Sequence, residues 1–144
     1  MTLLLRINME DFVTFELAVK LREKGFREDC IAYYHTDGEL IYNSDEYRGG
    51  DYRSLLMSYN SLPKNPIGCE QIDAPVISQV LKWLRKEKDI YITIFIDDDS
   101  DIPVTYEIYK GSECVCTHQG EYFALKDWSK CELRAIEYVL DNLI

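Results

Sequence analysis

Hydrophobic residues recur at helical spacing in two long stretches of the chain. After Asp73, residues such as Val76, Val80 and Leu84 fall on one face of a helix, while charged residues such as Arg85 fall on the other. Asp73 suits the N-cap of this helix, and Pro75 suits its first turn, where no helical partner exists for a backbone N–H. The pattern therefore predicts an amphipathic helix with one buried side.

A second amphipathic helix is expected at the end of the sequence. Ser129 and Glu132 have the spacing of a capping box, and Trp128 and Leu133 have the spacing of a hydrophobic staple. An apolar stripe follows and continues to Leu143. We expect this helix to pack on a sheet.

The strand predicted over residues 90–96 is the most apolar in the sequence. Its four isoleucines alternate with Tyr91, Thr93 and Phe95, so each set faces one side of a sheet. Because both faces are mostly apolar or aromatic, we expect a strand that is central in its sheet or covered on both faces.

Shorter signals predict the remaining elements. Thr14 is a candidate N-cap for a helix over residues 15–24, which Gly25 ends. Residues 30–34 and 39–43 flank Asp37-Gly38 as a hairpin, and residues 104–109 and 113–118 form a second hairpin. A short strand is expected over residues 2–8.

The fold class follows from the order of these elements. Residues 44–72 lack periodicity, apart from a short helix expected over residues 52–59, and this segment either packs over the sheet or binds a partner. The chain of 144 residues fits a single α+β domain. We expect one mostly antiparallel sheet of about five strands, in a single layer, packed against three helices.

Charge and cysteine content restrict the partners and the compartment. The net charge of −10 opposes direct binding to nucleic acid or to an anionic membrane surface. No apolar run approaches the roughly 20 residues of a membrane span, so we expect a soluble protein. Five cysteines without a disulfide-framework spacing, and a start unlike a secretory signal, favour a reducing cytoplasm.

Several stretches together resemble a known group of proteins. They are KLREKGF, the paired tyrosines of the first hairpin, APVISQVLKWLRKEKDIYITIFI, TYEIYK and the terminal VLDNLI. The chain is in these respects similar to a family of short, acidic, uncharacterised proteins of gut Bacteroidetes and of their phages or mobile elements. The resemblance implies an accessory protein of a phage or mobile element, and it supplies no catalytic motif.

Two clusters have the side chains of a metal site. Strand alternation would place Cys114, Cys116 and His118 on one face, but residues two apart on a strand lie nearly 7 Å apart, so we expect packing and no metal. The acidic loop of Asp97, Asp98, Asp99 and Asp101 lacks the glycine and glutamate of an EF-hand, with Ile102 and Ile108 in those positions. We expect a solvated turn.

No motif indicates catalysis. A nucleophile would have to be one of Cys30, Cys69, Cys114, Cys116 and Cys131, with His35 or His118 as its base, and no local signature surrounds any of them. We therefore expect no enzymatic activity and no cofactor. A small enzyme with an unrecognised site is the third and most distant reading.

The tyrosines carry the functional hypothesis. Eleven of them are too many to bury with satisfied hydroxyls in one small domain, and tyrosine is enriched at protein interfaces. We expect a non-catalytic protein-binding factor whose candidate interface residues are Tyr47, Tyr52 and Tyr59. The alternative is an acidic nucleic-acid mimic that occupies the basic groove of a host nucleic-acid-binding protein.

Overall fold

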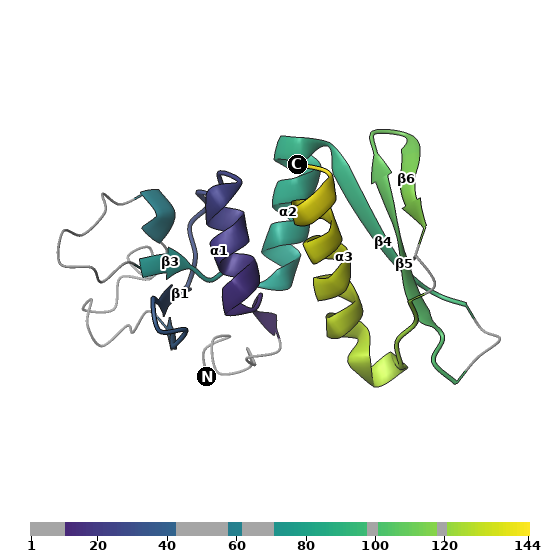
Figure 1. Cartoon of the computed structure of the whole chain (residues 1–144), viewed down its shortest axis with the longest axis horizontal. Coiled ribbons are helices and arrows are strands. Elements are labelled where there is room, and N and C mark those ends of the chain that lie inside the picture. The colour runs from purple at the N-terminus through teal and green to yellow at the C-terminus, as the bar shows by residue number, and fades with distance from the viewer. Residues whose placement is uncertain (1–10, 43–57, 62–70, 98–100, 118–120) are drawn as a thin grey trace, which may run out of the picture. The chain divides into compact units, whose positions relative to one another are not determined.

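The computed structural model describes residues 11–42, 58–61, 71–97, 101–117 and 121–144 (Figure 1). The chain divides into two compact units, Met1–Val76 and Ile77–Ile144, and each is described by itself. Within the described residues the units contain three α-helices and two three-stranded antiparallel sheets, which confirms the α+β class. The expectation of one domain over residues 1–144 stays a prediction, and the strand expected at 2–8 lies outside the described residues.

The first unit begins with the helix α1, Phe15–Glu23, and its predicted ends are confirmed. The Thr14 hydroxyl accepts a hydrogen bond from the Leu17 backbone N–H at 3.3 Å, as an N-cap does. After the helix, Gly25 has a φ of 93°, in the left-handed region that glycine adopts without strain. Leu17, Ala18 and Leu21 are buried along one face.

The sheet of the first unit has the strand order β2-β1-β3. Strands β1 (Ala32–His35) and β2 (Leu40–Tyr42) form the predicted hairpin, in which Gly38 has a φ of 88°. The third strand, β3 (Gln71–Asp73), pairs with β1 and was not predicted. The expectation of an irregular segment over residues 44–72 is therefore wrong at residues 71 and 72. Of the short helix expected over residues 52–59, residues 52–57 lie outside the described residues, and a 3-10 turn, η5, occupies Tyr59–Ser61.

The predicted N-cap role of Asp73 is wrong. Helix α2, Ile77–Lys88, starts four residues later, because Asp73 pairs with Tyr33 in the sheet and its carboxylate bonds to the start of η5. Pro75 lies before the helix, where its carbonyl accepts a hydrogen bond from the Val13 N–H at 3.1 Å. Pairing within the sheet therefore outweighs the local preference of Asp73 for the N-cap of a helix.

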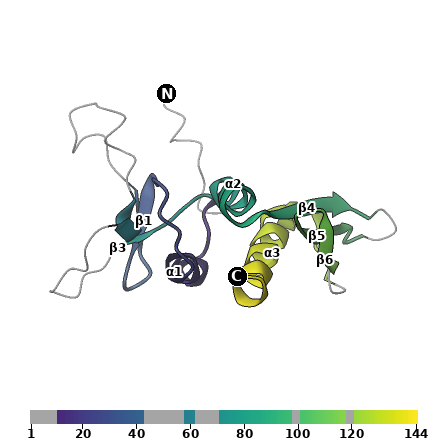
Figure 2. The same ribbon diagram turned by 90° about the horizontal axis from the view of Figure 1, so that it is seen from above.

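The second unit is a three-stranded sheet with helices on one face. Its elements are α2, then β4 (Ile90–Ile96), β5 (Val104–Lys110) and β6 (Glu113–Thr117), then the 3-10 turn η6 (Leu125–Asp127) and α3 (Trp128–Asn142). The strand order is β4-β5-β6, so the second predicted hairpin is confirmed. Figure 2 shows α2 and α3 on the same side of this sheet.

One sheet of about five strands is not found among the described residues. In each unit the middle strand, β1 or β5, already has a neighbour on both edges, which gives two separate sheets. The expected central position of residues 90–96 is also wrong for this sheet, since β4 lies at its edge among the described strands. The exposure of its four isoleucines increases along the strand. Ile90 is fully buried, Ile92 and Ile94 are half-buried, and Ile96 is 54% exposed.

The last helix begins two residues earlier than its expected N-cap, Ser129, implies. The turn η6 runs directly into α3, with the Asp127 N–H donating to the Ala124 carbonyl at 2.9 Å. Ser129 therefore lies inside the first turn, and no side chain caps the helix. The predicted apolar stripe is confirmed at Ile136, Val139 and Leu140, since all three are buried.

Candidate functional site

The face of the second unit's sheet that points away from α2 and α3 carries a group of tyrosines and carboxylates. The opposite face holds buried residues such as Ile90, Tyr106 and Ile108. The register pairs Tyr91 with Tyr109, and alternation along the strands then fixes which residues share the outer face. We call this surface the tyrosine face, and it consists of Tyr91, Thr93, Phe95, Asp97, Thr105, Glu107, Tyr109, Cys114, Thr117 and Tyr122, together with Asp89 just before β4.

Tyr122 belongs to this face because of the pairing of its neighbour, Phe123. Phe123 forms a bridge with buried Val104, so the preceding residue points to the other side of the sheet. The Thr105 hydroxyl donates to the Glu121 carbonyl at 2.9 Å, and Thr105 is buried although it belongs to the outer face. This end of the tyrosine face is therefore covered by residues of its own unit.

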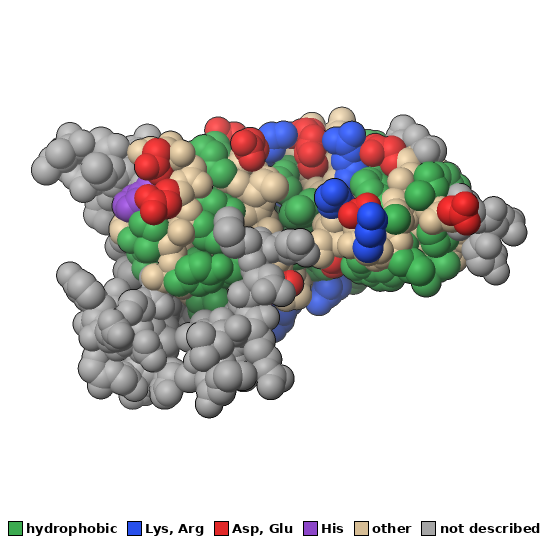
Figure 3. Space-filling model, turned by 90° about the horizontal axis from the view of Figure 1, so that it is seen from below, with side chains coloured by type: hydrophobic (Ala, Val, Ile, Leu, Met, Phe, Trp, Pro, Cys, Tyr) green, Lys and Arg blue, Asp and Glu red, His purple; other side chains and the backbone are tan. Residues whose placement is uncertain are grey.

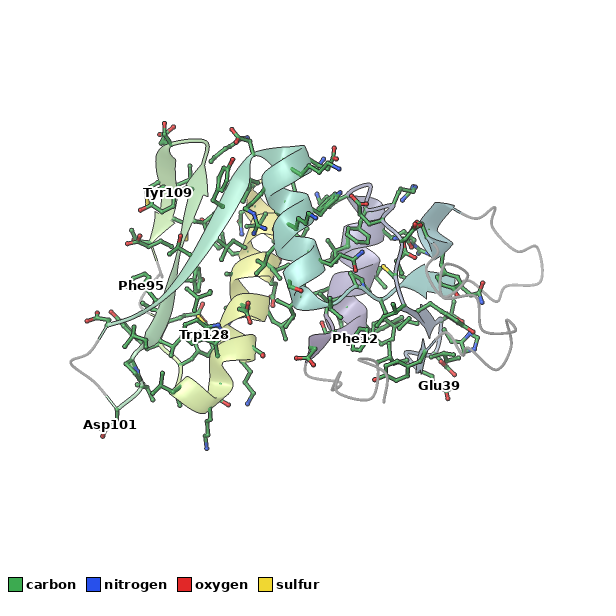
Figure 4. All side chains as sticks on the ribbon, turned by 180° about the vertical axis from the view of Figure 1, so that it is seen from behind. Phe12, Glu39, Phe95, Asp101, Tyr109 and Trp128 are labelled. Atoms are coloured by element: carbon green, nitrogen blue, oxygen red, sulfur yellow. The ribbon has the colours of Figure 1, made fainter. Side chains whose placement is uncertain are left out.

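Each of the three tyrosine hydroxyls donates a hydrogen bond to a carboxylate. Tyr91 donates to Asp89 Oδ1 at 3.0 Å, and Tyr109 donates to Glu107 Oε2 at 2.9 Å. Tyr122 donates to Asp97 Oδ2 at 3.4 Å. Tyr91 is 39% exposed, and Figure 4 shows Tyr109 and Phe95 on the strands, away from the helices. The face thus presents aromatic rings beside anionic oxygens.

The pKa of each of these three tyrosines is raised above its ordinary value. The hydrogen bond to Asp89 raises the pKa of Tyr91, and the negative charge of Asp89 adds to it. The hydrogen bond to Glu107, followed by its charge, raises the pKa of Tyr109. Partial burial, followed by the charge of Asp97, raises the pKa of Tyr122. These phenols therefore remain hydrogen-bond donors at neutral pH.

The strand residues of the tyrosine face include no lysine or arginine, whereas Glu107 on β5 and Asp97 just after β4 are both acidic. Arg85 of α2 lies close enough to this face that its positive charge opposes the rise in the pKa of Tyr91. The turn at Asp89 lies against the turn at Gly111. Asp89 has a φ of 55°, and its carbonyl accepts a hydrogen bond from the Gly111 N–H at 2.8 Å. A Cβ at Gly111 would lie 3.2 Å from Asp89 Oδ2, so glycine lets the two turns meet.

A second exposed surface lies at one end of the same unit. In Figure 3 hydrophobic side chains gather over the sheet end of this unit. The large exposed residues there are Ile96, Ile102, Leu125 and Trp128, with Leu125 the most exposed at 57%.

The predicted cysteine and histidine cluster is not assembled. A β-bulge between Ile108 and Tyr109 pairs Cys116 with Ile108 on the buried face and Cys114 with Tyr109 on the outer face. The expectation of both thiols on one face is therefore wrong, and His118 lies outside the described residues. In the described part of the chain, no three His, Cys, Asp or Glu side chains gather as metal ligands.

The other predicted residues are dispersed. Burial raises the pKa of the Cys131 thiol to about 12, so it stays protonated and is a poor nucleophile. His35 ends β1, with its ring 5.4 Å from that of Tyr33. Cys30 is buried, and Cys69 lies outside the described residues. In the acidic loop Asp97 and Asp101 are exposed, whereas Asp98 and Asp99 lie outside the described residues.

Of the three tyrosines chosen from the sequence, Tyr59 lies among the described residues. Tyr59 is 5% exposed and packs its ring 4.5 Å from that of Tyr33, so it is a core residue. Tyr47 and Tyr52 lie outside the described residues, and their role stays a prediction. The tyrosine face was missed because its members come from three separate segments that only strand register brings together.

A buried carboxylate in the first unit is structural. Asp73 is fully buried, and it accepts hydrogen bonds from the Tyr59 N–H and from the Ser58 hydroxyl. Asn60 completes the network, since its side chain accepts from the Asp73 N–H at 3.0 Å and donates to the Phe26 carbonyl at 2.9 Å. Burial raises the pKa of Asp73 to about 6. The network fastens η5 to the sheet.

Comparisons with protein-family models, with curated proteins and with solved structures gave no match. In the described residues, no helix is both long and apolar enough to cross a membrane.

Proposed function

We propose that this chain is a non-catalytic protein-binding factor whose tyrosine face takes a basic segment of a partner protein. One observation carries the proposal: three tyrosine hydroxyls donate to three carboxylates on a sheet face whose strand residues include no lysine or arginine. Aromatic rings attract lysine and arginine through their π-electrons, and carboxylates bind guanidinium groups through charge-assisted hydrogen bonds. A peptide rich in arginine matches both features.

The charge of the whole chain supports the same partner. A net charge of −10 speeds the approach of a basic protein and repels nucleic acid. The free thiols of Cys114 and Cys131 suit the reducing cytoplasm that we propose as the location. The accessory role in a phage or mobile element comes only from the family resemblance.

The nucleic-acid mimic is the second candidate, because it uses the same acidic surface. A mimic depends on its carboxylates and tolerates the loss of aromatic rings, whereas the proposed site needs both. Removal of a tyrosine ring therefore separates the two candidates. A small enzyme remains the third.

The test uses a fluorescent peptide of about ten residues in which arginine and glycine alternate, with a glutamine-for-arginine peptide as the control probe. Glu107→Gln and Tyr109→Leu in the full chain should each weaken binding by about threefold or more, since each removes one contributor to the site. The matched control is Glu87→Gln, which removes one exposed charge from α2 and leaves the face intact.

Three outcomes decide the matter. Loss of affinity in both face variants but not in Glu87→Gln supports the proposal. Loss in Glu107→Gln alone supports the mimic. Equal affinity in all three variants, or equal binding of the glutamine peptide, contradicts a basic-segment site on this face.

A further inference from the structure

The edge of β4 that faces away from β5 carries an unused row of backbone groups. At one end of the pair the Asp97 N–H donates to the Pro103 carbonyl, and at the other the Gly111 N–H donates to the Asp89 carbonyl. In an antiparallel ladder such hydrogen-bonded pairs alternate, so Tyr91, Thr93 and Phe95 bond to β5. The N–H and C=O groups of the four isoleucines therefore point outward, and within the described residues no strand meets them.

Between Asp89 and Asp97, the β4 strand itself has none of the features that protect sheet edges. Strand β4 has seven residues, IYITIFI, without a charge, a proline or a glycine. Its register with β5 is continuous over all seven pairs. The opposite edge, β6, carries Glu113 and a bulge, and in the first unit the edge strands β2 and β3 have three residues each. Proteins use short strands, charged residues and bulges to prevent an edge strand from pairing with another chain. Because β4 lacks these features, its edge is available for such pairing.

The sequence of β4 is complementary to itself. When two copies run antiparallel about Thr93, Ile90 lies opposite Ile96, Tyr91 lies opposite Phe95, and Ile92 lies opposite Ile94. We infer that β4 pairs with β4 of a second copy of this chain, which joins two sheets into one of six strands. This inference goes beyond the proposed function and does not depend on it.

The bonding pattern fits this register. The outward groups belong to the isoleucines, so each Ile–Ile pair exchanges two backbone hydrogen bonds across the two-fold axis. Opposite residues share a face, so the isoleucine sides of both copies continue one another, and the 54%-exposed Ile96 lies beside Ile90 of the second copy. On the tyrosine face, Tyr91 meets Phe95 of the second copy as an aromatic cross-strand pair.

Two charges oppose the association. Asp89 and Asp97 lie just outside the ends of β4, and the register brings Asp89 of one copy opposite Asp97 of the other. Salt screens repulsion between exposed charges. The dimer should therefore become tighter as sodium chloride is raised, whereas binding of a basic peptide to the tyrosine face should become weaker.

The test is a charge exchange at Thr93, which is exposed and lies opposite itself across the axis. The full chain, studied by sedimentation equilibrium, should be a dimer. Thr93→Lys and Thr93→Glu each place like charges about 5 Å apart at their Cβ atoms and should weaken the dimer about fivefold or more. An equimolar mixture of the two variants should restore it. The matched control, Thr117→Lys, places the same charge on exposed β6 and should remain a dimer.

A monomeric wild-type chain at about 100 µM, or a dimer equally strong in both Thr93 variants, would overturn the inference. Failure to recover the dimer on mixing would overturn the register. Circular dichroism of each variant checks that the fold is retained. Peptide binding by Glu107→Gln is read separately, because Glu107 lies on β5 and takes no part in the β4 edge.

Discussion

The Ser58 hydroxyl donates a hydrogen bond of 2.9 Å to the carboxylate of Asp73, fifteen residues further along the chain. Burial raises the pKa of this carboxyl from 3.8 to about 6, although the hydrogen bonds from Tyr59 and Ser58 oppose the rise. The folded chain therefore keeps a proton that the unfolded chain has released between about pH 4 and pH 6. Stability from this group is complete below that window and is lost as the pH rises through it.

Asp73→Asn should remove this pH dependence. We expect the wild type to lose on the order of 2 kcal/mol between pH 4 and pH 7.5, relative to the variant, because an asparagine side chain carries no ionisable proton. Urea unfolding at both pH values measures the difference. Asp37→Asn, at an exposed hairpin carboxylate, is the control and should follow the wild type. A wild type and an Asp73→Asn variant with parallel pH profiles would refute the burial argument.

Glu107→Gln should bring the pKa of Tyr109 down toward its ordinary value. The hydrogen bond to Glu107 and its negative charge are the two largest causes of the rise. A carbon NMR titration of the tyrosine Cζ signals measures the change. The Tyr91 signal serves as an internal control, since Asp89 holds its raised pKa, and a shift of both signals by the same amount would argue against the pairing described.

Two leucines provide a test of burial in the second unit. Leu84 is fully buried on α2, whereas Leu125 is 57% exposed on η6. Leu84→Ala should lower the free energy of unfolding by about 2–5 kcal/mol, and Leu125→Ala should change it by less than about 0.5 kcal/mol. Chemical denaturation measures both. Similar losses in the two variants would show that η6 is packed more tightly than the structure indicates.

The cap of α1 makes a fourth prediction. Thr14→Ala removes the acceptor for the Leu17 N–H and should lower stability by about 1 kcal/mol. Thr14→Ser keeps a hydroxyl in that position and should retain most of the stability. If serine and alanine were equally destabilising, the methyl group of Thr14 and not its cap would be the source of the effect.

Local patterns predicted the elements whose signals lie within a few residues. The Thr14 cap, the turn at Gly38 and the hairpin of β5 and β6 follow from short-range sequence chemistry, and all three are confirmed. Asp73 shows where that reasoning fails. Its side chain suits a helix cap, but β3 pairs with β1 far along the chain, and the carboxylate bonds to η5 instead.

The candidate site depended on information that local patterns lack. Alternation correctly predicted that Tyr91, Thr93 and Phe95 share one side of a strand. Both faces were expected to be covered, but α2 and α3 lie on the other side of the sheet. Register with β5 adds Tyr109, and the bridge at Phe123 adds Tyr122. A one-residue bulge likewise separated Cys114 from Cys116, which strict alternation had joined.

Backbone NMR of the full chain, titrated with the arginine–glycine peptide, tests the tyrosine face most directly. The account predicts that amide shifts concentrate at Tyr91, Thr93, Phe95, Glu107 and Tyr109, while buried residues of α3 such as Ala135 and Val139 stay unchanged. Shifts confined to the helices or to the first unit, or no shifts at all, would contradict it.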